Sequence, residues 1–166
     1  MALRRRRERP PTWPGLEPDE RVVSWADTAE GAVVAATARG LWWPTGDGPR
    51  LIAWQHVDKA VWRDGVLSVV QADVVDDELL VDRPAVTARL SVPRDLPPTV
   101  RKRVEANIVA TELVSVGGGA VRFVGRRQPG RDGVTWWAHL EPGTPSSEAV
   151  RSAVRARLAR LRADRD

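Results

Sequence analysis

Tryptophan residues in this chain recur within short runs of β-type residues that are separated by turn residues. The runs are SWADT, GLWWP and LIAWQHVDKAVWRDG in the first 65 residues, and GVTWW much later. Valine, threonine and aromatic side chains fit the pleated, half-buried surface of a sheet, whereas Gly, Asp and Pro mark its turns. The pattern therefore predicts a small sheet whose core is filled by large rings. No pattern of comparable strength indicates a reaction.

The front of the chain is expected to form about seven short antiparallel strands. Asp64 and Gly65 favour a type I′ hairpin turn. Apolar and polar residues alternate from 85 to 92, as in a half-buried strand. The expected strands are RVVSWADT (21–28), AVVAATA (32–38), LWWP (41–44), RLIAW (50–54), QHVDKAVWR (55–63), VLSVVQAD (66–73) and AVTARLSV (85–92).

The hydrophobic period changes after residue 95. Val100, Val104 and Ile108 share one stripe, which predicts a helix over 99–113 with Asp95 as its N-cap. A second hairpin is expected, with arms near 120–126 and 133–140 around a turn at 128–132. A final helix is expected to follow a cap at Ser146 or Ser147. Its apolar stripe is Val150, Val154, Leu158 and Leu161, with arginines around it.

Composition limits the class of protein. A chain of 166 residues fits one compact domain with appendages. It has no cysteine, which excludes disulfides, thiolate zinc sites and thiol nucleophiles. No apolar run approaches the roughly 20 residues of a membrane span, and no apolar segment follows the basic start MALRRRRERPP. We therefore expect a cytoplasmic protein that is neither exported nor inserted into a membrane.

Charge is distributed unevenly along the chain. Residues 1–9 carry a net charge of +4, residues 10–95 carry −6, residues 96–145 carry +3, and residues 146–166 carry +3. The basic residues are 24 arginines and two lysines in a chain rich in Ala, Val, Gly and Pro, a bias that a high-GC genome also produces. The β-rich front is thus acidic, and both ends are basic.

The order of elements resembles the pleckstrin-homology (PH) superfold, and in detail its bacterial PH-like and GRAM-like group. Thr37, Leu41 and Trp42 match the end of one family strand and the step into the next. Ile52 and Trp54 match an apolar-Trp strand, and residues 57–62 match the stretch after it. The resemblance covers about residues 20–113. It implies an α+β, mostly β fold, in which a seven-stranded antiparallel bent sheet or barrel is closed by a helix.

The chain is expected to have four parts, of which only the second carries the resemblance. They are a basic, proline-rich extended arm (1–20), the PH-like barrel with its helix (21–113), an appended β-hairpin (114–145) and a basic amphipathic C-terminal helix (146–166). The hairpin and helix that follow the barrel either extend its sheet or form a small appended layer. Trp13 is expected to pack on the domain or on a partner. The family implies a binding fold for proteins, lipids or peptides, without shared catalytic residues. Phosphoinositide binding through a basic first loop is disfavoured, because residues 27–30 are Asp, Thr, Ala and Glu.

The residues suited to chemistry form no catalytic or metal-binding motif. The two histidines, His56 and His139, show no metal-ligand spacing. The acidic residues Asp73, Asp76, Asp77, Glu78 and Asp82 lack the order of a calcium-binding loop and favour a solvated segment. Gly117–Gly119 precedes a strand, whereas phosphate cradles of this type open a helix. We therefore expect no enzymatic activity, no cofactor, no metal and no small-molecule substrate.

The second hairpin carries the best candidate recognition surface. If Val134, Trp136, Ala138 and Leu140 point inward, Trp137 and His139 lie on the outer face. Pairing Phe123 with Trp136 would then place Arg122 opposite Trp137, close enough for a cation–π contact. The predicted patch consists of Arg122, Arg126, Trp137 and His139. The alternative is that the final helix covers it.

The chain thus indicates an interaction or scaffold module that binds a protein or peptide partner. The alternative is a nucleic-acid-associated protein whose arginine-rich ends bind RNA or DNA phosphates. The same ends could also meet an anionic membrane surface. The candidate phosphate contacts are Arg4, Arg5, Arg6, Arg7, Arg151 and Arg155.

Overall fold

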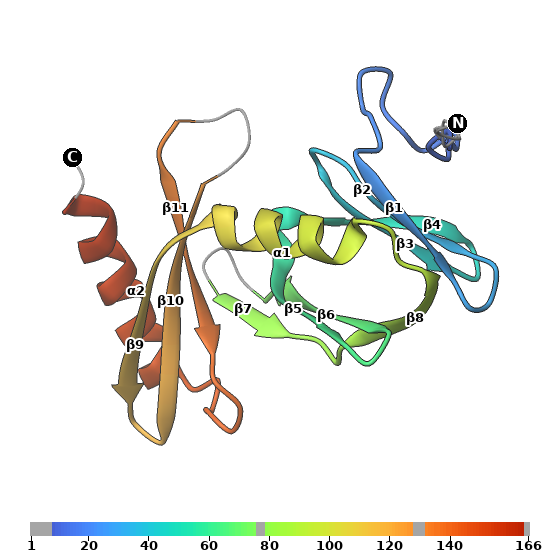
Figure 1. The fold of residues 1–166 in the computed structure, drawn as a ribbon. Coiled ribbons are helices and arrows are strands. Elements are labelled where there is room, and N and C mark those ends of the chain that lie inside the picture. Colours follow the sequence, from blue (N-terminus) through green and yellow to red (C-terminus); the bar gives the residue numbers. More distant parts are fainter. Residues whose placement is uncertain (1–7, 76–78, 128–131, 165–166) are drawn as a thin grey trace.

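The computed structural model describes residues 8–75, 79–127 and 132–164. It is an α+β structure, mostly β, as expected (Figure 1). Its N-terminal β-unit contains β1 (Ser24–Thr28), β2 (Val33–Ala36), β3 (Gly40–Thr45), β4 (Gly48–Ala53), the 3-10 turn η1 (Trp54–His56), β5 (Val57–Arg63), β6 (Val66–Val74), β7 (Leu79–Asp82), β8 (Val86–Val92) and helix α1 (Leu96–Asn107). Its C-terminal β-unit contains β9 (Ile108–Val116), β10 (Gly119–Arg127), β11 (Val134–Leu140) and helix α2 (Glu148–Ala163).

The strands form one mixed sheet that does not close into a barrel. Its order is β4-β3-β2-β1-β8-β6-β7-β11-β10-β9, and β5 pairs with the other edge of β6. The expectation of a seven-stranded antiparallel bent sheet or barrel was wrong in three respects: β7 is an eighth strand before α1, the sheet is mixed, and it is not closed. The nine-residue β6 pairs with β8 through its first half and with β7 through its second. β7 then pairs in parallel with β11, so the sheet continues into the C-terminal β-unit.

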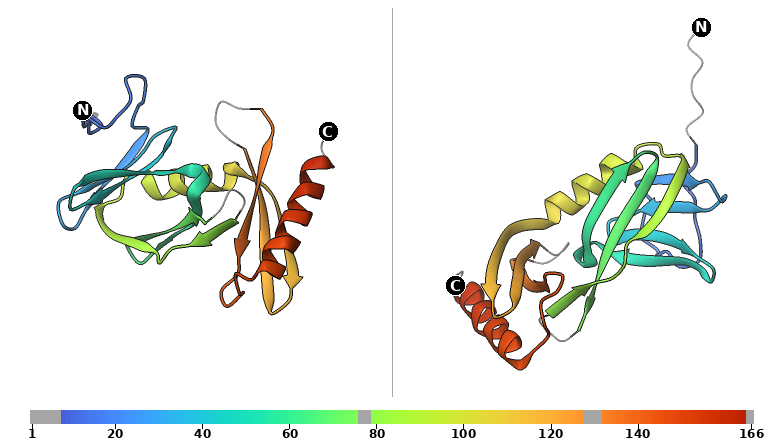
Figure 2. Two further views of the ribbon diagram at one scale, coloured as in Figure 1. Left: turned by 180° about the vertical axis from the view of Figure 1, so that it is seen from behind. Right: turned by 90° about the horizontal axis from the view of Figure 1, so that it is seen from below.

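Each unit has its own apolar core. Helix α1 crosses the N-terminal β-unit, where its buried Leu96, Val100 and Val104 pack on the sheet (Figure 2). Helix α2 packs on the C-terminal strands through Val150, Val154 and Leu158, as the periodicity predicts. The Ser147 side chain accepts from the Val150 N–H at 3.3 Å, which confirms the expected cap. Among the helices of the described residues, none is long and apolar enough to cross a membrane.

Helix α1 begins and ends earlier than expected. It spans 96–107 instead of 99–113, and Ile108 already belongs to β9. The β-branched residues Ile108, Val109 and Thr111 fit a strand, and pairing with β10 outweighs the helical periodicity. Asp95 precedes the helix, but its carboxylate accepts from the Ser24 hydroxyl at 2.7 Å instead of capping it. Residues 108–113 therefore extend the C-terminal sheet.

The two hairpin predictions had different outcomes. Asp64 and Gly65 both have positive φ, 51° and 77°, which confirms the type I′ turn. In the second hairpin the expected register was wrong by two residues, because Gly125 and not Phe123 lies opposite Trp136. A Cβ at residue 125 would lie 3.2 Å from the indole of Trp136, so the missing side chain makes room for the ring. The expected turn at 128–132 falls largely outside the described residues.

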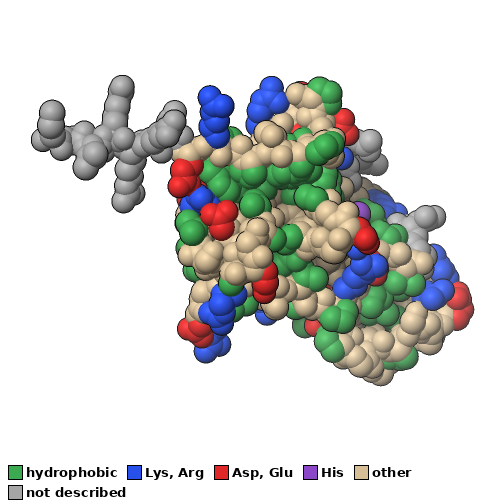
Figure 3. Space-filling model, turned by 90° about the vertical axis from the view of Figure 1, so that its right-hand side faces the viewer, with side chains coloured by type: hydrophobic (Ala, Val, Ile, Leu, Met, Phe, Trp, Pro, Cys, Tyr) green, Lys and Arg blue, Asp and Glu red, His purple; other side chains and the backbone are tan. Residues whose placement is uncertain are grey.

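The described part of the N-terminal arm is docked on the sheet. Trp13 packs edge-on against Trp42 with ring centroids 5.3 Å apart, as expected for the domain-packed alternative. Glu20 anchors the end of the arm. One carboxylate oxygen accepts from Thr37 Oγ1 at 2.6 Å and from Trp42 Nε1 at 2.8 Å, and the other accepts from Arg39 at 3.0 Å. Figure 3 shows this end of the molecule, where apolar side chains lie between acidic and basic ones.

Candidate functional site

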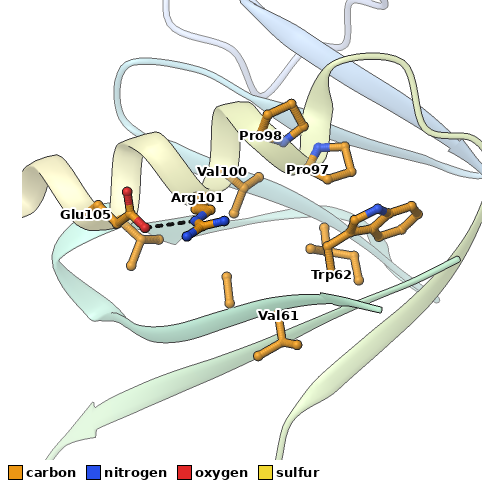
Figure 4. Close-up of a pocket in the computed structure, with 10 residues that line it drawn as sticks. Val61, Trp62, Pro97, Pro98, Val100, Arg101 and Glu105 are labelled. Carbon is orange, nitrogen blue, oxygen red and sulfur yellow. Dashed lines mark hydrogen bonds and ion pairs between the residues drawn. The ribbon is translucent and has the colours of Figure 1, made fainter. Parts of the chain in front are cut away.

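A groove lies between edge strand β5 and helix α1 (Figure 4). Its volume of about 530 Å³ is in the range of pockets that hold ligands or several side chains. Its walls are largely apolar. The lining residues are Ala60, Val61, Trp62, Leu67, Pro97, Pro98, Val100, Arg101, Val104 and Glu105.

One wall of the groove presents backbone groups as well as side chains. Within the described residues β5 pairs only with β6, so its other edge is open. Arg63 and Val66 flank the two-residue turn and form the hydrogen-bonded pair beside it. Because the bonding direction alternates along an antiparallel strand, the N–H and C=O groups of Ala60 and Trp62 point to the open edge. An extended chain placed there could continue the sheet.

Apolar side chains are exposed beside this edge. Val61 is 39% exposed and Trp62 is 41% exposed, which leaves a large ring at the mouth of the groove. Pro97 and Pro98 form the opposite wall in the first turn of α1, where a missing N–H costs no helical hydrogen bond. The apolar residues of β5 and the two prolines are visible in the sequence. That they face each other depends on how α1 packs across the sheet.

The rim of the groove is weakly positive. Arg101 Nε donates to Glu105 Oε1 at 2.8 Å where α1 borders the groove (Figure 4). On β5, Lys59 and Arg63 are exposed on either side of Val61. Arg63 lies 3.6 Å from Asp64 at the turn. Lys59 is thus the cation best placed to meet an acidic group of a bound segment.

The predicted recognition patch lies in a second place, between the two β-units. Arg122, Arg126, Trp137 and His139 share one face of the hairpin, as expected from strand alternation. The prediction that this face is exposed was wrong for Arg126 and His139, whose exposures are 0% and 1%. The covering element is not α2, which packs on the opposite face, but the N-terminal β-unit. Asp58 of β5 and Asp82 of β7 lie against the patch.

Arg122 makes the strongest contacts across this boundary. Two of its guanidinium nitrogens donate to the two oxygens of Asp58, each at 3.0 Å, and its Nε donates to Glu141 at 2.9 Å. Burial opposes the charge of Arg122, but the hydrogen bonds to Asp58 and Glu141 outweigh it and raise the pKa of Arg122. Burial also opposes the charge of Asp58, yet Arg122 holds the pKa of that carboxyl below its usual range. The pair therefore stays ionised.

Arg126 is a buried cation with weak compensation. Among the described residues, none hydrogen-bonds to its three guanidinium nitrogens, and the nearest carboxylate oxygen, on Asp58, lies 3.9 Å away. Burial lowers the pKa of Arg126, although the charge of Asp58 opposes the shift. Asp58 thus balances two arginines at once.

Asp82 and His139 complete this cluster, and their pKa values shift in opposite directions. Burial, together with the neighbouring Asp58, raises the pKa of Asp82 to about 7. Burial lowers the pKa of His139 to about 4, although Asp58 attracts its proton. His139 Nδ1 lies 3.4 Å from Asp82 Oδ1. Near neutral pH His139 is therefore uncharged, and Asp82 is partly protonated and able to donate a hydrogen bond.

These residues do not fit a metal ion well. Asp58, Asp82 and His139 offer ligand atoms within 4.8 Å of one another. Both oxygens of Asp58, however, already accept from Arg122, and Arg126 adds a second positive charge beside them. A divalent cation would have to displace one arginine and repel the other. The cluster is better suited to holding the two units together.

We expect Asp82→Asn to stabilise the protein at pH 8 and to have less effect at pH 5. The folded-state pKa of about 7 lies above the ordinary value of 3.8, so the native state loses stability as pH rises through this interval. The amide of asparagine cannot ionise, so the variant avoids a second negative charge beside Asp58. Urea unfolding at several pH values measures the difference between the two proteins, with the exposed Asp47→Asn as control. A difference that does not grow with pH would contradict the expectation.

Trp137 lies on the face of the patch but not opposite Arg122, and the other predicted residues lie apart from both features. Trp137 is half-buried and lies opposite Val124, so the expected pairing with Arg122 was wrong. A cation–π contact is found elsewhere in the described residues, where the guanidinium carbon of Arg94 lies 5.0 Å from the ring centroid of Trp25. On α2, Arg151 bonds to Ser146 and Arg155 to Glu148. The candidate phosphate contacts Arg4, Arg5, Arg6 and Arg7 lie outside the described residues, as do Asp76, Asp77 and Glu78 of the acidic segment.

Comparison with known proteins identifies no relative. No family model matches the chain, and neither a curated protein nor a solved structure matches it significantly.

Sequence reasoning missed the partners of the patch and the groove itself. Asp58 lies within one of the expected strands, but nothing in its local pattern indicates an ion pair with a residue 64 positions away in sequence. Trp62 belongs to the expected strand 55–63, whose local pattern does not show that the ring borders an opening. The one signal of the groove in the sequence was the pair of consecutive prolines, Pro97 and Pro98, at the start of the apolar stripe of the helix.

Proposed function

We propose that this protein is a non-enzymatic, PH-like interaction module of the bacterial cytoplasm that binds an extended peptide segment of a protein partner. The segment lies along β5 in the groove beneath α1. The observation that supports the proposal most is the open β5 edge beside an apolar groove. Addition of a strand to a free sheet edge supplies backbone hydrogen bonds, while the groove selects alternate side chains.

The chemistry of the groove specifies the segment. The backbone groups of Ala60 can bond to one residue of the bound segment, and those of Trp62 can bond to the residue two positions away in that segment. The side chains between α1 and β5 are apolar, so the segment should carry apolar residues at alternate positions. Lys59 and Arg63 are exposed on either side of Val61, which lines the groove, and they favour an acidic group beside them. The preferred ligand is therefore a short β-type sequence with acidic flanks.

The test begins with a displayed library of random twelve-residue peptides selected against the immobilised protein. Enriched peptides are synthesised and their Kd is measured by calorimetry. We expect Trp62→Glu to weaken binding at least about tenfold, because it places a carboxylate at the mouth of the groove and repels acidic flanks. Val92→Glu on β8 is the matched control, because that side chain is 43% exposed and does not line the groove.

Amide hydrogen exchange then distinguishes strand addition from other binding modes. A peptide that extends the sheet should slow exchange at Ala60 and Trp62, while the amides that already bond to β6 change little. Peptides that bind equally well to Trp62→Glu, or that leave Ala60 and Trp62 unprotected, would overturn the proposal. Retention of a labelled RNA or DNA oligonucleotide, falling steeply between about 50 and 200 mM salt, would favour the nucleic-acid alternative.

A further inference from the structure

Strand β9 forms the C-terminal end of the sheet, and its outer edge is open within the described residues (Figures 1 and 2). It is nine residues long, and its Leu113 is 65% exposed, the most exposed of the large apolar side chains described. Helix α2 covers this strand only in part, because a cavity of about 220 Å³ lies between α2 and the side chains of Val114 and Val116. The strand thus offers a long, apolar and only partly covered edge.

The direction of the backbone groups along β9 follows from its partner. Val116 lies opposite Gly119 across a two-residue turn, which makes them a hydrogen-bonded pair. Ala120, opposite Ser115, turns its own N–H and C=O the other way, to Thr144 and Glu141. By alternation, the backbone groups of Thr111, Leu113 and Ser115 point to the open edge.

This edge lacks the features that protect the opposite end of the sheet. Edge strands commonly carry proline or exposed charge that discourages pairing. β4, at the other end, has Pro49 and the exposed Arg50. β9 has neither, and its one charged residue, Glu112, is bound by Arg157 of α2 at 2.5 Å. An unprotected edge of this kind is suited to receiving another strand.

We propose that β9 pairs with β9 of a second copy of this chain, antiparallel and about a two-fold axis at Leu113. The outward backbone groups of the two Leu113 residues then bond to each other, and those of Thr111 bond to Ser115 of the second copy. This register buries the exposed leucine against its twin and allows hydroxyl contacts between Thr111 and Ser115. It also places Glu112 opposite Val114, whereas a shift that sets Glu112 against Glu112 brings like charges together.

The strand is therefore self-complementary, which is what a two-fold interface requires. The product is a continuous sheet across two copies, with α2 of each copy on the same face. Because α2 packs mainly on β11, two strands from the edge, it leaves the junction open. A single strand pair buries little area, so the dimer should be weak and concentration-dependent. The proposal is independent of the peptide-binding groove.

The absence of cysteine allows a direct test of the register. In the two-fold pairing the Cα atoms of the two residues at 113 lie about 5.5 Å apart, within disulfide range. Mild oxidation of Leu113→Cys should therefore give a covalent dimer. Val109→Cys is the matched control on the same strand. This variant should form no covalent dimer, because the two residues at position 109 lie about 27 Å apart in the pairing.

Analytical ultracentrifugation of the unmodified protein between about 5 and 500 μM should show reversible dimerisation. Leu113→Glu should shift the monomer–dimer midpoint to at least about tenfold higher concentration. Val86→Glu, at an exposed position of β8, should leave it unchanged. A protein that stays monomeric over the whole range overturns the proposal. So does a dimer that Leu113→Glu does not weaken, or equal crosslinking of the two cysteine variants.

Discussion

Replacing Asp58 by alanine should lower the free energy of unfolding by about 3–5 kcal/mol, the cost of removing one partner from a buried cluster of charges. The Asp58 carboxylate binds Arg122 through both oxygens and, of the carboxylates in the described residues, is nearest to the fully buried Arg126. Its loss would leave two positive charges at the boundary between the β-units. Urea unfolding at pH 7 measures the effect, with all proteins at one concentration so that any association contributes equally.

Asp47→Ala is the control for this substitution, because Asp47 lies exposed in the turn between β3 and β4. We expect a change within about 0.5 kcal/mol there. The double variant Asp58→Ala, Arg126→Met tests the cause. If uncompensated charge is responsible, removal of the second charge should recover part of the loss. An Asp58→Ala protein that is as stable as the Asp47→Ala control would show that the ion pairs contribute nothing.

Glu20→Ala should destabilise the protein by about 2–4 kcal/mol, because it leaves buried donors without an acceptor. Thr37 and Trp42 both donate to the Glu20 carboxylate, whose side chain is 1% exposed. Burial alone would raise the pKa of Glu20, but hydrogen bonds, the largest from Thr37, lower it to about 2. The arm that carries Trp13 should loosen as well, and tryptophan fluorescence together with urea unfolding would detect both effects.

The pH dependence provides a second check on Glu20. Since its folded-state pKa lies below the ordinary value of 4.5, its contribution is present above about pH 4.5 and is lost as pH falls toward 2. The difference in stability between the original protein and Glu20→Ala should shrink over that interval. Glu17→Ala is the matched control, because Glu17 lies 3.6 Å from the same Arg39 but is 57% exposed. An equal loss in both variants would contradict the assigned role of burial.

The open sheet edges connect the two proposals on binding. β5 and β9 are both unpaired on one side within the described residues, but they differ in their surroundings. β5 borders a groove with a helix as its far wall, which suits a short segment. β9 stands at the end of the sheet with an exposed leucine near its middle, which suits a strand of equal length. The same backbone chemistry can therefore serve two different partners.

Local patterns predicted much of the secondary structure. The turn at Asp64 and Gly65, the cap at Ser147 and the apolar stripe of α2 depend on φ preferences and side-chain spacing, which neighbouring residues determine. The end of α1 was predicted less well, because residues 108–113 satisfy a helical stripe and also have β propensity. Pairing with β10, which is distant in sequence, decided between the two.

The candidate site was predicted in part. Strand alternation placed Arg122, Arg126, Trp137 and His139 on one face, and the structure confirms that they share it. Alternation says nothing of what lies opposite a face, so the burial of Arg126 and His139 could not be predicted. The register of the hairpin depended on a glycine at 125 that accommodates the ring of Trp136, a contact between two strands.

By itself, the sequence determined that the protein is mostly β, that its tryptophans belong largely to the framework, and that a capped amphipathic helix ends the described chain. These properties follow from short-range propensity and periodicity. Only the tertiary structure decided that the sheet stays open, that β7 joins the two β-units, and that Trp62, not Trp137, borders the groove. The physical reason is that sheet order, register and burial depend on contacts between residues far apart in sequence. A local sequence pattern does not indicate the free energies of those contacts.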